Sequence, residues 1–365
     1  MPSQAERFWN NGRTMLHNRQ LILKSRPTGR VALSDFEIRE QPLAPVRDGE
    51  VLTQTLYLSI DPTNRVWMTD RPQYMPPVAI GEVMRGFGLG VVMESRHPGF
   101  RKGDLVSGLL GWQLYSYWDA TALRPLRKLP QDLGVPPTAF LGVLGLTGGL
   151  TAYFGMLVIG NPKAGDTVVV SAAAGSVGSL AGQLAKHRGC RVIGIAGSAE
   201  KCRYVTDELG FFACIDHSRE DVAAELARLC PGGIHVHFEN VGGTILEAAL
   251  AHLAVAARVV LCGLISQYNE QEPPLGPRNF DMILHRRARV EGFIVSDFAA
   301  RFPEAFAELV PLVHSGKLTY REHIVSGLEQ APAAVNMLFD GTNRGKLLIE
   351  VASASHSQRT SRVTI

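Results

Sequence analysis

The chain has 365 residues, of which 45% are hydrophobic and 19% are charged. This composition is typical of a folded globular protein and excludes a disordered or collagen-like chain. The 37 basic and 34 acidic residues leave a net charge of +3 that is spread along the sequence, which argues against nucleic-acid binding. The length predicts two domains and admits a third.

The chain begins with a polar segment, residues 1–18, which lacks the apolar core of a signal peptide. We therefore expect a cytoplasmic protein, in agreement with five isolated cysteines that form no disulfide framework. Residues 139–160 carry no charge and are long enough to span a membrane. Six glycines within this stretch and prolines on both sides of it favour a buried helix at a domain junction instead.

The first 139 residues are predicted to be β-rich. Short strand-like runs occupy residues 21–24, 50–58 and 90–94, and turn-forming residues separate them, for example at 27–29. This pattern predicts a compact barrel or sandwich.

From about residue 140, strands alternate with helices. A continuous apolar strand is predicted at 167–171, and further strands are predicted at 191–196, 213–215, 235–239 and 258–262, with a sixth at 291–295. This alternation predicts an α/β fold with a doubly wound parallel sheet. The mixed segment 297–352 could rejoin the first domain, and the polar tail 353–365 is expected to be disordered.

The turn after the first parallel strand carries the strongest chemical signal. Residues 172–178 follow an Ala-x-x-Gly-x-x-Gly pattern, with Ala173 at the first glycine position. Gly175 lets the backbone approach a pyrophosphate, and Gly178 allows the following helix to pack closely on the strand. The strand before the turn and the helix after it favour dinucleotide binding over a purely structural turn.

The end of the second strand bears on the choice of cofactor. An NAD site normally has an acidic residue there, whereas this chain has Gly-Ser-Ala at 197–199, followed by Lys201 and Arg203. A lysine attracts a 2′-phosphate, so the sequence predicts NADPH rather than NADH. Glu200 is the one acidic residue nearby, and its place in the first helical turn is typical of a carboxylate that interacts with the helix dipole.

Several motifs in the same order resemble one family. They are Asn-Arg-Gln at 18–20, Leu-Ser-Ile-Asp-Pro at 58–62, the turn at 172–178, Gly-Ser-Ala-Glu-Lys at 197–201, Glu-Asn-Val-Gly-Gly at 239–243, Cys-Gly-Leu-Ile-Ser-Gln-Tyr-Asn at 262–269 and Gly-Thr-Asn-Arg-Gly-Lys at 341–346. Over about residues 18–352 the chain resembles the zinc-independent medium-chain dehydrogenase/reductases, in the branch of prostaglandin, alkenal and curcumin reductases.

The resemblance implies a GroES-like catalytic domain made of residues 1–139 and 297–352, with a Rossmann domain at 140–296 between them. It also implies NADPH, a small enone or enal substrate and a homodimer. By position, the implied cofactor contacts are Gly175, Ser176, Val177 and Gly178 for the pyrophosphate, Ser198, Lys201 and His217 for the 2′-phosphate, Asn240 for the ribose, Cys262, Gly263, Ile265, Ser266, Tyr268, Phe293, Ile294 and Val295 around the nicotinamide and substrate, and Asn343 for the carboxamide.

Two positions depart from the family pattern. His217 stands where relatives usually have a tyrosine, which weakens the transfer of its role, although a protonated histidine could also bind phosphate. Thr63, which lies with Asn64 in the implied substrate pocket, also replaces a tyrosine that lies near the substrate in relatives. The preferred substrate is therefore expected to differ from those of curcumin or prostaglandin reductases.

The N-terminal domain has no cysteine and only two separated histidines, His17 and His97, so we expect no catalytic zinc. Carbonyl reduction then lacks its usual electrophile, whereas reduction of an activated C=C bond needs only a hydrogen-bond donor for the carbonyl oxygen. Tyr268 is the candidate donor, and the cofactor's ribose hydroxyl can share the role. The alternative is that Tyr268 only packs against the cofactor.

Other chemical groups are predicted to be structural. His235 and His237 share one face of a strand without a third metal ligand, and the cysteines at 190, 202, 214 and 230 form no Cys-x-x-Cys pair. Asp61 and Arg65 could form an ion pair near the cleft or contact the substrate.

The leading hypothesis is thus an NADPH-dependent enone or enal reductase. The alternatives are a quinone reductase, which would use the same hydride step, and a non-catalytic NADPH-binding sensor or structural protein.

Overall fold

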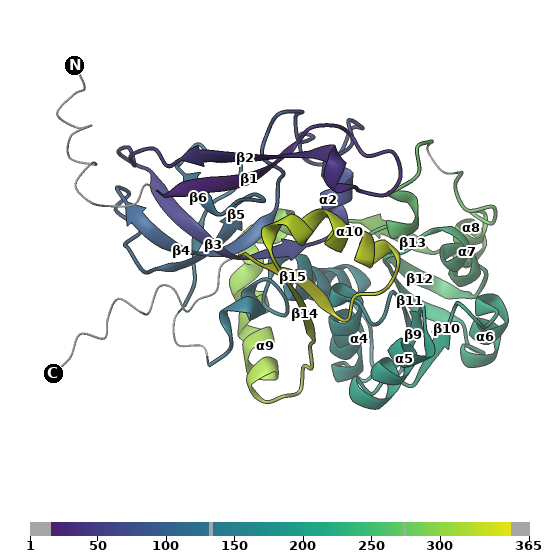
Figure 1. Cartoon of the computed structure of the whole chain (residues 1–365). Helices are drawn as coiled ribbons and strands as arrows, with labels where there is room; N and C mark the ends of the chain where they lie inside the picture. Colours follow the sequence, from purple (N-terminus) through teal and green to yellow (C-terminus); the bar gives the residue numbers. More distant parts are fainter. Residues whose placement is uncertain (1–15, 131–133, 273–274, 352–365) are drawn as a thin grey trace, which may run out of the picture.

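The structure is a computed structural model of the chain, and it describes residues 16–130, 134–272 and 275–351. Figure 1 shows a β-rich part on the left and a parallel sheet covered by helices on the right, with β14 (Glu322–Ser326) and β15 (Lys346–Glu350) between them. The predicted fold class, a β-rich domain joined to a doubly wound α/β sheet, is confirmed. The tail at 353–365, predicted to be disordered, lies outside the described residues.

The β-rich part is built on a seven-stranded sheet of order β14-β15-β3-β4-β5-β7, in which β6 also pairs with β3. Its other strands are β3 (Val51–Ile60), β4 (Phe87–Ser95), β5 (Leu105–Leu109), β6 (Tyr115–Trp118) and β7 (Arg127–Lys128), and β1 (His17–Leu23) and β2 (Phe36–Pro42) form a separate antiparallel pair. The strands predicted in this part overlap with β1, β3 and β4. Because β15 pairs antiparallel with β3, the last strands of the chain join the sheet that its first third began.

The α/β part contains six parallel strands in the order β10-β9-β8-β11-β12-β13. They are β8 (Thr167–Ser171), β9 (Arg191–Ala196), β10 (Ala213–Asp216), β11 (Ile234–Glu239), β12 (Leu253–Leu261) and β13 (Arg289–Gly292). The strand order reverses between β8 and β11. In doubly wound folds, ligands bind at the carboxyl ends of the strands at such a switch point.

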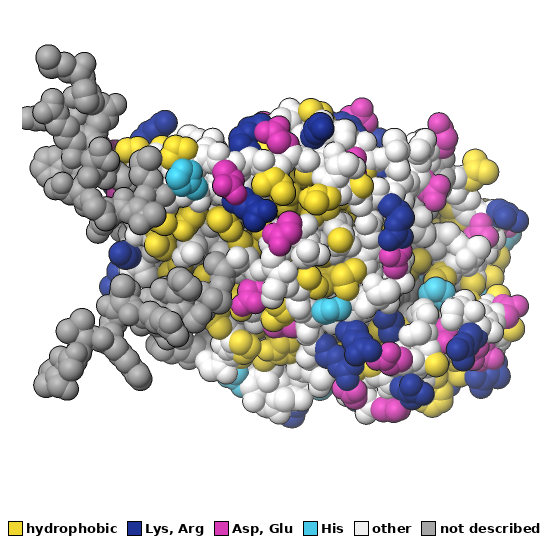
Figure 2. Space-filling model, in the orientation of Figure 1, with side chains coloured by type: hydrophobic (Ala, Val, Ile, Leu, Met, Phe, Trp, Pro, Cys, Tyr) yellow, Lys and Arg dark blue, Asp and Glu magenta, His cyan; other side chains and the backbone are white. Residues whose placement is uncertain are grey.

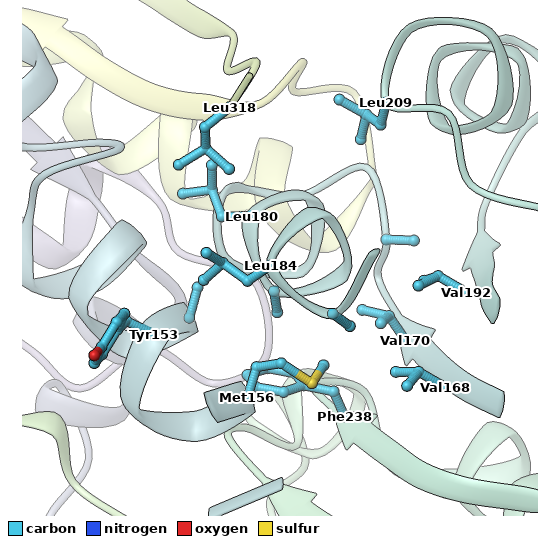
Figure 3. Close-up of a cluster of buried hydrophobic side chains, with 14 of the residues drawn as sticks. Tyr153, Met156, Val168, Val170, Leu180, Leu184, Val192, Leu209, Phe238 and Leu318 are labelled. Atoms are coloured by element: carbon cyan, nitrogen blue, oxygen red, sulfur yellow. The ribbon is translucent and has the colours of Figure 1, made fainter. Parts of the chain in front are cut away.

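Helices cover both faces of this sheet, which explains the continuous apolar sequence of β8. Val168 and Val170 point into a core cluster with Leu180 and Leu184 of α4 (Ser176–His187), as Figure 3 shows. Val169 points to the opposite face, into a cluster with residues of α6 (Val222–Leu229) and α7 (Gly243–Ala251).

The sixth predicted strand was placed too late in the sequence. The structure ends β13 at Gly292, whereas the prediction ran from 291 to 295. The neighbouring strand β12 ends at Leu261, which lies opposite Gly292, so the residues after Gly292 have no ladder to join.

The uncharged stretch 139–160 is largely buried, as predicted, but its longer helical part begins only at Leu146 and is kinked at Thr147. A Cβ atom on Gly148 would lie 2.1 Å from the carbonyl oxygen of Gly142, and one on Gly149 would lie 1.7 Å from that of Val143. The chain folds back on itself at these glycines, which excludes a single helix from residue 139. No helix of the described residues is long and apolar enough to cross a membrane.

α9 (Phe302–His314) follows β13 and packs against the helical stretch 146–160, because its Phe302 and Leu309 share a core cluster with Phe154. α2 (Pro62–Trp67) and α10 (Ala331–Phe339) instead share the core of the β-rich part. The predicted domain boundary at 297 thus falls before a helix that packs on the α/β part, and this boundary stays a prediction.

Candidate active site

The glycine-rich turn joins β8 to α4 at the switch point. Ala172 has a φ of +49°, and Gly175 caps the N-terminus of α4. A Cβ atom on Gly178 would lie 2.4 Å from the carbonyl oxygen of Ala172, so only glycine allows the helix to pack this closely on the turn. The Ser176 hydroxyl is buried and has no hydrogen-bond partner within the described residues.

The end of β9 carries the residues predicted to bind a 2′-phosphate. The Ser198 Oγ caps the short helix α5 (Ala199–Arg203) and accepts a hydrogen bond from the Lys201 N–H at 3.3 Å. Burial lowers the pKa of the Lys201 ammonium, and the nearby Glu200 charge partly offsets this effect. His217 is exposed, and its Nε2 lies 3.1 Å from the place that a Cβ atom on Gly197 would take.

A pocket of about 210 Å³ opens beside Lys201. Its lining comes from both parts of the chain, namely Ala174, Ser198, Glu200, Lys201, Tyr204, Arg321 and residues 341–345. Gly345 forms an isolated parallel bridge with Gly175, so the segment before β15 lies directly against the glycine-rich turn. Asn343, for which the family resemblance implies contact with the carboxamide, lines this pocket together with Lys201, and its Nδ2 donates to the Gly345 carbonyl at 3.0 Å.

The structure also accounts for Glu200. Its carboxylate forms a salt bridge of 2.9 Å with Arg344, which comes from the other part of the chain. The sequence does not identify Arg344 or Arg321 as pocket residues. Both come near the pocket only because the strands that follow them, β15 and β14, join the β-rich sheet.

A buried polar network lies at the carboxyl ends of β8 and β11. The Glu239 carboxylate is fully buried, accepts hydrogen bonds from the Ser171 hydroxyl at 2.8 Å and the Gly242 N–H at 2.9 Å, and lies 2.6 Å from His237 Nε2. Burial opposes its ionisation, but His237 and the backbone donors together hold the pKa of Glu239 below its usual value. Asn240 donates from its side chain and its backbone to Ser171, at 2.7 Å in both cases. This network fixes the loop after β11 against the end of β8.

The same network supports the segment that carries Tyr268. The N–H groups of Cys262 and Gly263 donate to the Glu239 carbonyl, and the Ser266 hydroxyl donates to the Val241 carbonyl. Ile265 N–H donates to the Asn240 carbonyl at 3.0 Å. The segment after β12 is therefore held to the loop after β11.

The Tyr268 hydroxyl accepts a hydrogen bond of 3.0 Å from the Leu264 N–H, so its own proton remains available for donation. Burial raises the pKa of Tyr268, which keeps the phenol protonated. Burial also raises the pKa of the Cys262 thiol to about 12, so this thiol is neutral. Tyr268 is thus protonated, as a hydrogen-bond donor must be. Its hydroxyl also contacts the backbone of its own loop, at Leu264.

The residues after β13 pack against the helical stretch 146–160. The Phe293 ring comes within 2.7 Å of the place that a Cβ atom on Gly155 would take, and Val295 packs against the same core cluster. Ile294 lies between them, at the start of the turn that follows β13.

The predicted ion pair between Asp61 and Arg65 is wrong. Asp61 precedes α2 and pairs with the buried Lys346 of β15 at 2.5 Å, whereas Arg65 lies one turn later and donates to the Asn269 side chain at 3.0 Å. Arg65 therefore joins the β-rich part to the residue that follows Tyr268.

Thr63 lies on α2 beside Tyr74, and their hydroxyl groups are 2.6 Å apart. Tyr74 had not been singled out from the sequence, because the intervening turn hides its nearness to Thr63. Asn64 is buried, and its amide accepts from the Asp61 N–H at 2.8 Å and donates to the Arg85 carbonyl at 3.2 Å. The two polar side chains predicted for the substrate pocket thus differ in their availability to a substrate. Thr63 is partly exposed, whereas the buried Asn64 amide is already hydrogen-bonded to backbone groups.

Two family models match the chain. The model described as the N-terminal domain of oxidoreductase matches residues 19–126, and the model described as zinc-binding dehydrogenase matches residues 176–315. The NADPH-dependent curcumin reductase of Escherichia coli (strain K12) is 44% identical over 93% of this chain and 99% of its own length. The chain belongs to the medium-chain dehydrogenase/reductase family.

Two further relatives agree with this membership of the medium-chain dehydrogenases/reductases. The NADP(+)-dependent 2-alkenal reductase of Nicotiana tabacum is 40% identical over 92% of this chain and 98% of its own length. The crystal structure of CurA from Vibrio vulnificus in complex with NADPH matches with a TM-score of 0.85 and 43% identity, covering 92% of this chain and 99% of that chain. The resemblance inferred from the sequence motifs is confirmed.

The possible metal ligands of this medium-chain dehydrogenase/reductase have other partners. His235 accepts a hydrogen bond from the Thr167 N–H at 3.0 Å, and His237 is bonded to Glu239. In the part of the chain that the structure describes, no group of three or more His, Cys, Asp or Glu side chains could hold a metal ion.

Proposed function

We propose that this protein uses NADPH to reduce the C=C bond of α,β-unsaturated ketones or aldehydes. The observation that carries the proposal is the hydrogen-bonded network at the switch point. This network joins the end of β8, the strand before the glycine-rich turn, to the segment after β12 that carries the protonated Tyr268. Curcumin reductase and 2-alkenal reductase, which match over nearly their full lengths, support the same class of substrate.

The residues present fit NADPH. Among the described residues, the buried Ser176 hydroxyl has no hydrogen-bond partner, and the half-buried Lys201 ammonium forms no hydrogen bond or salt bridge. We propose Gly175, Ser176, Val177 and Gly178 for the pyrophosphate, Ser198, Lys201 and His217 for the 2′-phosphate, and Asn240, Cys262, Gly263, Ile265, Ser266, Tyr268, Phe293, Ile294, Val295 and Asn343 for the remaining contacts. From Phe293 we expect backbone contacts, because its ring packs against Gly155.

When bound, NADPH supplies the hydride that is transferred to the β-carbon of the substrate. Negative charge would then develop on the carbonyl oxygen, where a preorganised donor would stabilise it, and the α-carbon would take a proton to complete the saturated product. Tyr268 is the donor that we propose, because its hydroxyl already accepts a hydrogen bond from Leu264 and retains its proton. Thr63 and Tyr74 are proposed to line the substrate side of the cleft.

An acceptor panel tests this function. NADPH consumption is followed spectrophotometrically with an enone, an enal, a quinone or no acceptor. Saturable consumption with the enone and enal, and little with the quinone, is the expected result. Preference for the quinone would favour quinone reduction instead, and tight NADPH binding without turnover on any acceptor would favour a sensor or structural protein.

Replacing Lys201 by alanine is expected to raise the Michaelis constant for NADPH by about 100-fold, and that for NADH by less than about threefold. The physical reason is that a lysine–phosphate contact in a partly buried site contributes about 2–3 kcal/mol, and NADH lacks the phosphate. Steady-state kinetics with both cofactors measures the difference. Lys163→Ala, an exposed lysine on the loop before β8, serves as the control. Equal effects on NADPH and NADH would remove Lys201 from the phosphate site.

We also propose a homodimer in which two copies meet along β13. This strand is the last in the sheet, so one of its edges has no partner strand among the described residues. Leu284 and Phe280, which lie before it, are 76% and 63% exposed, as expected for side chains that an interface covers.

Leu284→Glu is expected to shift the protein from twice the mass of a single chain to the single-chain mass, because a carboxylate would be buried at the interface. Light scattering after size-exclusion chromatography measures the mass, and Leu33→Glu in the β-rich part is the matched control. A wild-type protein that elutes as a single chain would contradict the dimer.

We propose a cytoplasmic location, which cell fractionation tests. We propose residues 1–139 and 297–352 as the GroES-like catalytic domain and 140–296 as the Rossmann domain, a division supported by the pairing of β15 with β3.

A further inference from the structure

The pocket beside Lys201 contains two arginines from outside the Rossmann βα units. Arg321 directly precedes β14, and Arg344 lies in the turn before β15. Figure 2 shows basic side chains gathered beside acidic ones over the region where Figure 1 places α4 and α5. The pocket beside Lys201 is therefore lined in part by cations from the segments next to β14 and β15.

The two arginines differ in how firmly their guanidinium groups are held. Arg321 lies 4.1 Å from the centre of the Tyr204 ring and also forms a salt bridge with Glu208. Within the described part of the chain, Arg344 forms a single salt bridge, to Glu200, in which the side chains are 66% and 58% exposed. An ion pair so open to water contributes little free energy, so Arg344 can exchange this partner for a stronger one.

Glu200 is the single acidic side chain among the residues that line the pocket. An unpaired carboxylate there would repel a phosphate dianion, and Arg344 cancels its charge. The pocket also holds the Tyr204 hydroxyl, which is buried and has no hydrogen-bond partner among the described residues. The pocket thus combines cations from both parts of the chain with an unused buried hydroxyl, which is the lining that a phosphate ester requires.

We propose that Arg344 is a second ligand of the NADPH 2′-phosphate, supplied by the β-rich part of the chain opposite Lys201. Its guanidinium exchanges the salt bridge with Glu200 for the phosphate but stays in the same pocket, where its charge still offsets the Glu200 carboxylate. A guanidinium can contact phosphate through two N–H groups at once, which favours the exchange. Because Gly345 already pairs with Gly175, phosphate binding by Arg344 fastens the segment 341–345 onto the glycine-rich turn. The 2′-phosphate thereby joins the two parts of the molecule.

The test uses two nucleotides that differ only in the group concerned. Adenosine 2′,5′-bisphosphate and adenosine 5′-phosphate are titrated by calorimetry into the full-length protein, without any substrate. Arg344→Ala is expected to weaken binding of the bisphosphate by about tenfold and binding of the monophosphate by less than about twofold. The control is Arg228→Ala, because Arg228 is also 66% exposed and pairs with Glu225 on α6, away from the pocket.

A second pair of variants separates direct contact from neutralisation of Glu200. Glu200→Gln is expected to tighten bisphosphate binding by about threefold, and adding Arg344→Ala to it is expected to weaken binding again by about tenfold. If the double variant binds the bisphosphate as tightly as Glu200→Gln alone, Arg344 acts only by cancelling the carboxylate, and the assignment as a ligand is overturned.

This inference rests on the proposed use of NADPH, and the experiment separates the two. Wild-type protein that prefers the bisphosphate, with no loss in Arg344→Ala, contradicts the inference alone. Wild-type protein that does not distinguish the two nucleotides contradicts the proposed cofactor itself. Since Arg344 is exposed, Arg344→Gln provides a second variant with the same expected loss, and unchanged melting temperatures show that both variants are folded.

Discussion

Replacing Lys346 by methionine is expected to lower the free energy of unfolding by about 3–5 kcal/mol. The side chains of Lys346 and Asp61 are only 3% and 7% exposed, and they form an ion pair of 2.5 Å between β15 and the start of α2. The substitution leaves the Asp61 carboxylate buried, with the Ser59 hydroxyl as its remaining side-chain partner. Denaturant unfolding measures the loss.

Two controls show whether the buried charge causes this loss. Adding Asp61→Asn to Lys346→Met should restore a large part of the stability, because no charge then remains unpaired. Lys128→Met removes a lysine that pairs with the buried Asp104 at 2.8 Å but is itself 43% exposed, and it should cost less than about 1 kcal/mol because Arg101 still pairs with Asp104. Equal losses in Lys346→Met and Lys128→Met would contradict the account.

Tyr268→Phe is expected to lower kcat by about 100-fold with an enone, while the dissociation constant of NADPH changes by less than about twofold. Loss of one preorganised donor to a developing oxyanion typically costs a factor of this size. Because burial raises the pKa of Tyr268, activity of the wild-type enzyme should not fall through its ionisation until the pH exceeds the usual phenol pKa of about 10.

The control for this substitution is Tyr117→Phe, which removes a phenol hydroxyl that donates to the Ala44 carbonyl in the β-rich part. Its kcat should be unchanged. An unchanged kcat in Tyr268→Phe would leave the cofactor's ribose hydroxyl as the donor and reduce Tyr268 to a packing residue.

Sequence patterns predicted those parts of the structure that depend on neighbours in the chain. β8 and β9 have the predicted bounds, since each is a short apolar run between turn residues. Ser198 and Lys201 share a pocket because both belong to one turn between a strand and a helix. The end of β13 was missed because it depends on where β12 stops, which its own sequence does not encode.

Contacts between distant segments were beyond such reasoning. A pair at positions 61 and 65 suggests neighbours on a helix, but Asp61 lies before α2 and turns to Lys346. Arg344 has no local feature that marks it as a pocket residue, because the pairing of β15 with β3 brings it there. The buried network of His237 and Glu239 could have been suspected from a histidine and a carboxylate two residues apart on one strand face.

The most direct test of the central claim is the position of the transferred hydrogen. The protein is incubated with an enone and with NADPH that carries deuterium at the transferring carbon, and the product is examined by mass spectrometry and NMR. A saturated ketone with deuterium on its β-carbon is the predicted product. An allylic alcohol with deuterium on the carbinol carbon would show carbonyl reduction instead and would contradict the account.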